Sequence, residues 1–141
     1  MGEWHLNSML AFTVGQHSSA GVKAQNEDAL GIRIPEGMLL DTKGAAAIIA
    51  DGVSAAEAGK EASETCVRNF LADYFATPDT WTVKKSTTQV LIALNRWLYS
   101  RGQHLREAQK GFVSTLSCII FKSHSAHLFH VGDSRIYRLR A

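Results

Sequence analysis

The sequence has 141 residues, of which 45% are hydrophobic and 20% are charged. This composition excludes intrinsic disorder and fits one globular domain or part of one. The net charge of +2 is too small to indicate nucleic-acid binding. No apolar run reaches membrane-spanning length and no basic-then-apolar N-terminal signal is present, so we expect neither a membrane span nor secretion.

The first third of the chain predicts strands joined by short turns. Residues 9–16 and 29–34 have the composition of strands, the second ending at Pro35. Turn residues follow at 36–37 and at 41–44. Residues 45–50 form a run of alanines and isoleucines, which is typical of a strand buried on both faces.

Two helices are expected next. In residues 56–76, apolar side chains recur every four residues, with Ser54 as a candidate N-cap and Pro78 as the stop. A second helix is expected over residues 82–100. Its buried face is predicted to consist of Val90, Leu91, Leu94, Trp97 and Leu98.

The chain then returns to strands, predicted at residues 112–122, 126–131 and 136–139. Three strands, two helices and three strands indicate an α+β fold, in which an antiparallel sheet is covered by helices. Cys66 and Cys118 lie far apart in apolar segments. We therefore expect free core thiols and a reducing, cytoplasmic location.

The predicted chemistry centres on Asp51, which follows the buried strand and precedes Gly52. A carboxylate at such a strand end loses water and needs a compensating charge, most simply a cation. Gly52 lacks the Cβ that would keep a ligand from the backbone. An Asp-Gly pair is also a common turn signal, and alone it is more often a turn than a ligand.

Two further acidic sites, Glu27-Asp28 and Asp133, also lie at predicted strand ends. Singly, each is better explained as a solvated turn, or for Asp133 as an ion pair with Arg135. Together the three sites favour a hard divalent cation such as Mg²⁺ or Mn²⁺, which prefers oxygen ligands. Two such ions can activate a shared water and clamp a phosphoryl group.

These residues resemble the metal-dependent serine/threonine protein phosphatases of the PP2C type (PPM). Residues 21–29 (GVKAQNEDA) are similar to the first motif of that family. Residues 49–53 (IADGV), followed by EAG at 57–59 and AS at 62–63, are similar to the second. Residues 114–116 (STL) and 130–137 (HVGDSRIY) resemble its central pair of strands.

The resemblance implies a β-sandwich of two sheets flanked by helices. It also implies hydrolysis of phosphoserine and phosphothreonine by water activated at two metal ions, without a phosphoenzyme. Asp51 would bridge both metals and the Gly52 carbonyl would bind one. Glu27 and Asp28 would hold metal-bound waters, and Asp133 would lie at a third metal found in some members.

Two departures from the family pattern stand out. The family usually places a phosphate-gripping arginine where this chain has Lys23, and lysine lacks the two-pronged guanidinium fork. The loop after Gly52 is often rich in glycine and histidine, whereas residues 53–56 read VSAA. We associate that variant with bacterial phosphatases fused to kinase domains.

The family also supplies metal ligands from a C-terminal half with no counterpart here. We therefore expect residues 1–141 to be the N-terminal portion of one phosphatase domain, lacking the C-terminal strands and ligands. Such a portion should bind metal weakly, be inactive alone, and self-associate through exposed sheet edges. The expected partners are a phosphorylated protein and a cognate serine/threonine kinase.

Two other interpretations remain. His124, His127 and His130 stand three apart, which suggests zinc, although on a strand this spacing turns successive side chains to opposite faces. The second alternative is a phosphatase-like module that binds a phosphoprotein or another partner without turnover, which Lys23 and the missing half favour.

Overall fold

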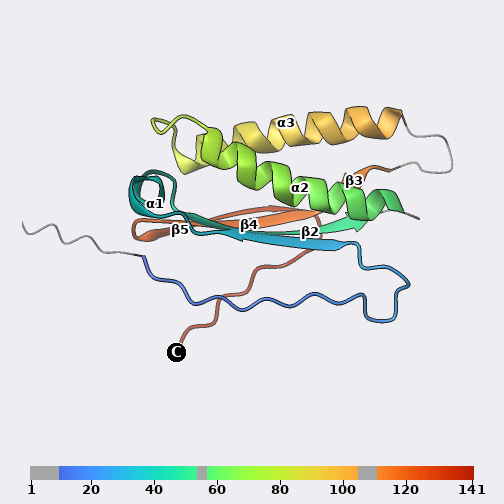
Figure 1. Ribbon diagram of the computed structural model, residues 1–141, viewed down its shortest axis with the longest axis horizontal. Helices are drawn as coiled ribbons and strands as arrows, with labels where there is room; N and C mark the ends of the chain where they lie inside the picture. The colour runs from blue at the N-terminus through green and yellow to red at the C-terminus, as the bar shows by residue number, and fades with distance from the viewer. Residues whose placement is uncertain (1–9, 54–56, 105–110) are drawn as a thin grey trace, which may run out of the picture.

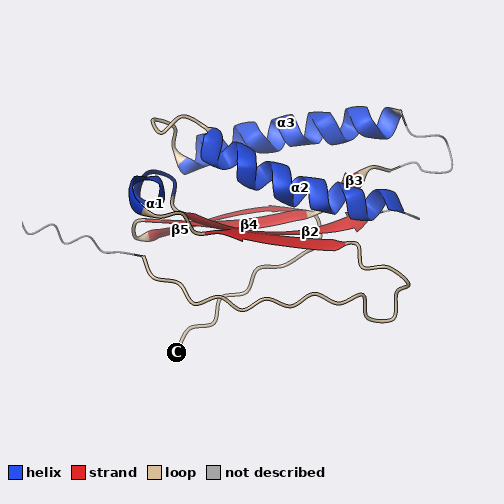
Figure 2. Ribbon diagram, viewed as in Figure 1, coloured by secondary structure: helices blue, strands red, loops and turns tan. Residues whose placement is uncertain are grey.

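The computed structural model describes residues 10–53, 57–104 and 111–141, which form an antiparallel sheet covered on one face by helices (Figures 1 and 2). No helix in these residues is long and apolar enough to cross a bilayer. The elements in chain order are β1 (Asp28–Arg33), α1 (Gly37–Lys43), β2 (Ala45–Val53), α2 (Glu57–Ala76), α3 (Val83–Gln103), β3 (Val113–Ser114), β4 (Leu116–Lys122) and β5 (Ser125–Val131).

Strand β2 lies inside the sheet, whose order is β1-β2-β4-β5, and the short β3 pairs with the end of β2. Every pairing is antiparallel. The predicted strand at residues 112–122 is therefore real but interrupted at Thr115, between β3 and β4. The α+β class predicted from the sequence is confirmed.

Helix α2 packs on β1 and β2, and α3 packs on the outer side of α2 (Figure 1). The four-residue repeat in α2 makes this contact, because its members Ala58, Ala62, Cys66 and Phe70 are all buried. Small residues on β2 match them on the sheet side. The predicted stripe of α3 is buried at Val90, Leu94 and Leu98.

Trp97 departs from the α3 prediction. It is 42% exposed, and its ring contacts the edge of Phe112 at a centroid distance of 5.7 Å. The candidate cap Ser54 lies outside the described residues, whereas α3 is capped by Thr82, whose hydroxyl accepts from the Lys85 N–H at 3.1 Å.

The prediction of turns alone between Pro35 and Ala45 was wrong, because α1 fills this stretch. Its last residue, Lys43, is only 2% exposed. The Lys43 ammonium donates to Thr77 Oγ1 and to the Pro78 carbonyl, both at 2.8 Å. These bonds satisfy the buried ammonium and fasten α1 to the C-terminal end of α2.

The predicted strands at residues 9–16 and 136–139 do not form: residues 10–16 and 136–139 are irregular, and Met9 lies outside the described residues. Figure 1 shows both segments running across the sheet face opposite the helices. Phe12 contacts Phe121 of β4 there, with ring centroids 5.4 Å apart. Of the two sheets implied by the family resemblance, the described residues therefore form one.

Candidate active site

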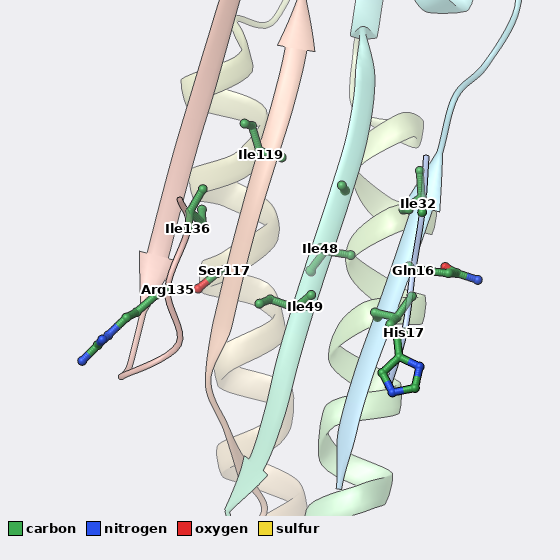
Figure 3. A pocket seen from close by; sticks show the side chains of 13 residues that line it. Gln16, His17, Ile32, Ile48, Ile49, Ser117, Ile119, Arg135 and Ile136 are labelled. Atoms are coloured by element: carbon green, nitrogen blue, oxygen red, sulfur yellow. The ribbon is translucent and has the colours of Figure 1, made fainter. Parts of the chain in front are cut away.

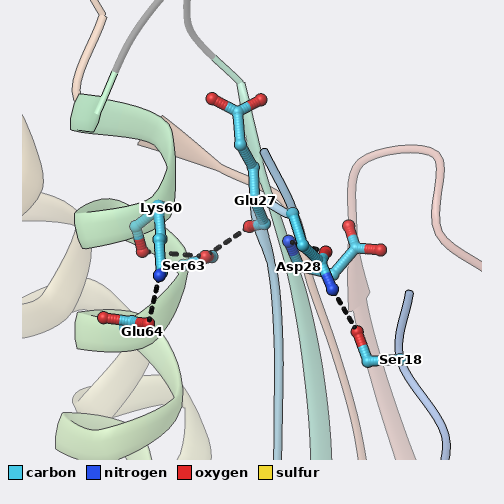
Figure 4. A network of polar contacts seen from close by, with 7 residues as sticks. Ser18, Glu27, Asp28, Lys60, Ser63 and Glu64 are labelled. Atoms are coloured by element: carbon cyan, nitrogen blue, oxygen red, sulfur yellow. Dashed lines mark hydrogen bonds and ion pairs between the residues drawn. The ribbon is translucent and has the colours of Figure 1, made fainter. Parts of the chain in front are cut away.

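The antiparallel register of β1 and β2 places Asp28 directly opposite Asp51 at one end of the sheet. Residues paired in this way have side chains on the same face. Asn26 holds the start of β1, since its Oδ1 accepts from the Asp28 N–H at 3.0 Å and its Nδ2 donates to Ser18 Oγ at 2.8 Å (Figure 4). The sheet therefore brings together two acidic residues separated by 23 positions.

Thr115 fixes the backbone of Asp51 from the other side. Its hydroxyl accepts from the Asp51 N–H at 3.0 Å, and its own N–H donates to the Asp51 carbonyl at 2.8 Å. The same hydroxyl contacts Ser134 Oγ at 2.9 Å. Asp51 is therefore held between β1 and Thr115, which in turn contacts the segment that follows β5.

The electrostatics of this end of the sheet centre on Asp51. Burial raises the pKa of the Asp51 carboxyl above its ordinary value, and the neighbouring Asp28 raises that pKa further. Asp133 adds to the rise in pKa, while the positive charge of Lys23 opposes it. Three of the predicted site residues thus act on the fourth, Asp51, and a positive charge placed here would be stabilised.

Glu27 is placed differently. Its backbone carbonyl accepts from the Gly52 N–H at 3.1 Å and from the Ser63 hydroxyl. Figure 4 shows its carboxylate directed away from Asp28. The side chains of Glu27 and Asp28 therefore point in different directions, as expected for successive residues entering a strand.

Gly52 is required by packing, a role that the sequence analysis did not foresee. A Cβ built on Gly52 would meet the backbone of Gly59 in α2, with the Gly59 Cα at 2.9 Å. The absence of a side chain at Gly52 therefore allows α2 to pack directly against β2.

Lys23 and Asp133 lie on exposed turns at this end of the molecule. The Lys23 N–H closes a turn by donating to the Ala20 carbonyl at 3.1 Å. Asp133 follows Gly132, whose φ of 105° suits glycine and whose added Cβ would crowd Thr115. Both charged side chains are carried by turns anchored near the strand ends.

A cavity of about 500 Å³ adjoins Asp28 and Asp51. Its lining includes Arg135 and four further polar residues for which the sequence predicted no role at the site: His17, Ser18, Ser19 and Ser134. A second, more apolar cavity of about 310 Å³ lies beside it on the same sheet face and shares His17 and Arg135 (Figure 3). No local motif marks residues 17–19, which lie in an irregular segment, whereas Ser134 and Arg135 belong to the motif at residues 130–137.

The donor set only partly fits a pair of divalent cations. Two facing carboxylates, one of them the partly buried Asp51, are suitable ligands for one hard cation. Within residues 10–53, 57–104 and 111–141, however, no group of three or more His, Cys, Asp or Glu side chains is close enough to hold a metal. The remaining coordination would have to come from backbone, water or another polypeptide segment.

Comparison with known proteins identifies the family and supports the fold. The family model for protein phosphatase 2C matches residues 16–141, whereas no curated protein matches the chain. The serine/threonine phosphatase PstP/Ppp of Mycobacterium tuberculosis is similar in structure, with a TM-score of 0.61 and 25% identity over 81% of this chain and 43% of its own.

A mutant bacterial serine phosphatase has a similar fold, with a TM-score of 0.64 and 22% identity over 86% of this chain and 56% of its own. The chain thus spans about half the length of both structures, and its fold is an incomplete PP2C fold, as predicted. The match of the family model over most of the sequence establishes the relationship: the chain belongs to the protein phosphatase 2C family.

Proposed function

We propose that this chain carries the N-terminal, cation-binding portion of a phosphatase that hydrolyses phosphoserine and phosphothreonine in proteins. The observation that carries the proposal is the pairing of Asp28 with Asp51 across β1 and β2, in a chain of this family. The charge effect of Asp133 on Asp51 supports the same location.

In this proposal Asp51 is the central cation ligand and Asp28 its partner. The Gly52 carbonyl binds one cation, Glu27 holds a metal-bound water on the side away from Asp28, and Asp133 serves an additional, weaker ion. Lys23 contributes a point charge for the substrate phosphate. The chemistry supplied by a bound Mg²⁺ or Mn²⁺ pair is activation of water and compensation of phosphoryl charge.

Calorimetric titration with Mg²⁺ and Mn²⁺ tests the proposal. We expect weak binding, with a Kd on the order of 0.1–1 mM, because the chain offers few ligands. Binding should be lost in Asp51→Asn and kept in Asp73→Asn, which changes an exposed aspartate on α2. Equal binding by both variants would refute the assignment of Asp51.

The chain alone is proposed to turn over little or no substrate, because its two facing carboxylates are too few for a complete two-metal site. A phosphopeptide assay with Mn²⁺ measures this directly. A rate abolished by Asp51→Ala would overturn the expected inactivity and support the phosphatase chemistry.

A non-catalytic binding module is the second candidate. It is favoured by the finding that the described residues bring together no group of three metal-binding side chains. In that case a phosphopeptide should bind with the same affinity in the presence and absence of Mg²⁺, and no phosphate should be released.

A further inference from the structure

The cavity beside Asp28 and Asp51 contains one imidazole, that of His17. His17 belongs to the irregular segment that crosses the helix-free sheet face, and its side chain is exposed. Figure 3 shows the ring over β1, directed toward the end of the sheet where β2 finishes. The imidazole therefore faces the end of the sheet that carries both carboxylates.

The segment that carries His17 is tied to the acidic pair. Ser18, the next residue, accepts from Asn26 Nδ2 at 2.8 Å, and Asn26 Oδ1 in turn accepts from the Asp28 N–H at 3.0 Å. Two consecutive hydrogen bonds thus connect the side chain of Ser18, the neighbour of His17, to the start of β1. The segment that carries His17 is therefore fastened to the strand that carries Asp28.

A phosphate group in this cavity needs positive or N–H groups around it, because Asp28 and Asp51 repel it. Lys23 supplies a mobile point charge without a fixed direction. Arg135 also lines the cavity, but its Nη1 donates to the Tyr137 hydroxyl at 3.2 Å and Figure 3 shows its guanidinium turned away from the sheet. His17 is the remaining cationic or N–H-bearing side chain of the described lining.

We infer that His17 is a substrate-binding residue whose imidazole N–H contacts the phosphate ester at the Asp28–Asp51 site. This inference rests on the proposed function, because it takes the substrate to be a phosphorylated side chain. It assigns to His17 a directional contact that Lys23 does not provide. A charge-assisted hydrogen bond of this kind is about twice as strong as a neutral one.

The test is an NMR titration of the full chain with phosphoserine in the presence of Mg²⁺, following the ring resonances of isotope-labelled histidines. The His17 signal is assigned by its loss in His17→Asn. We expect that signal to shift saturably with phosphoserine and not with serine. His17→Asn should weaken phosphoserine binding roughly tenfold.

His124→Asn is the matched control, because His124 lies in the β4–β5 turn at the opposite end of the sheet. The His124→Asn variant should bind phosphoserine with the same affinity as the wild type. The inference is overturned if phosphoserine causes no saturable shift at His17, or if His17→Asn binds within twofold of the wild type. Thermal unfolding of both variants confirms that they are folded.

The outcome is separable from that of the proposed function. Cation binding lost in Asp51→Asn, together with an unresponsive His17, would leave the phosphatase proposal standing and refute this inference. A His17 that binds phosphoserine in a chain without affinity for Mg²⁺ or Mn²⁺ would refute the cation site and support the phosphate contact.

Discussion

At the residue scale, Asp28 and Asp51 oppose each other although their charges repel. The register of β1 and β2 fixes them face to face, and Thr115 holds the Asp51 backbone through two hydrogen bonds. The sheet therefore holds the two carboxylates close together in spite of their repulsion. Electrostatic repulsion of this kind is typical of a functional site.

Replacing Asp51 by asparagine should stabilise the protein in the absence of divalent cations. Because the pKa of Asp51 is raised in the folded chain, the folded state binds a proton more tightly than the unfolded state. The stability contributed by Asp51 therefore falls as the pH rises through the interval between its ordinary pKa and its folded pKa. The asparagine variant has no charge at this position, so its stability does not fall in this way as the pH rises.

We expect Asp51→Asn to unfold a few degrees above the wild type at pH 7, with the difference shrinking toward pH 4. Thermal unfolding followed by circular dichroism measures both quantities. Asp73→Asn on α2 should show no such gain. A pH-independent difference, or a destabilised Asp51→Asn, would contradict the electrostatic account.

At the element scale, the contact between β2 and α2 depends on Gly52, which lies against the backbone of Gly59. Their backbones approach so closely that a Cβ on Gly52 has no space. Gly102, near the end of α3, is different, because among the described residues an added Cβ would meet only Phe112, at 3.5 Å. The two positions form a matched pair for substitution.

Gly52→Ala should destabilise the fold by about 3 kcal/mol, since the helix must move away from the strand. Gly102→Ala should be neutral or stabilise by up to about 1 kcal/mol through better helix propensity. Urea unfolding distinguishes the two. Equal stabilities for both variants would mean that α2 adjusts freely to the strand.

The longer elements were predictable from the sequence because their periodicity extends over several turns or pairs. Helix α1 was not, since seven residues are too few to show a helical period. The turn signals around it were nevertheless meaningful, because Gly37, the first residue of the helix, and Gly44, which follows its last residue, have positive φ values of 58° and 77°. Turn residues there mark where a short helix begins and ends.

The predicted strands at residues 9–16 and 136–139 failed for another reason. A strand needs a hydrogen-bonding neighbour, and sequence composition does not reveal whether one is available. The position of Asp28 and Asp51 near strand ends could be predicted, because residues 29–34 and 45–50 have the composition of strands, and the structure pairs the two residues. The position of His17 could not be predicted, because it lies in an irregular segment and its proximity to Asp28 arises only from the folded chain.

At the scale of the whole molecule, one sheet face lacks a helical cover. Its residues, which we term the open face, are Leu30, Ile32, Ala47, Ile49, Ile119 and Leu128. Two irregular segments cross it without forming a second sheet (Figure 1). Ile49 and Leu128 remain 42% and 55% exposed, so apolar surface is available for association.

We expect the chain to self-associate with rising concentration through the open face and the adjoining edge strand β5. Leu128→Lys, which places a charge on that edge, should shift the protein toward monomer. Ile92→Lys is the control, since Ile92 is 42% exposed on α3. Light scattering after size exclusion measures the masses, and a wild-type chain that is monomeric at all concentrations would refute the expectation.

Thr115 has a consequence for the whole site. Its single hydroxyl contacts both the Asp51 N–H and the Ser134 hydroxyl, so the turn bearing Asp133 and the end of β2 are mechanically linked. We expect a ligand that displaces the C-terminal segment to disturb the hydrogen bond between Thr115 and Asp51, and so to alter the spacing of the acidic groups.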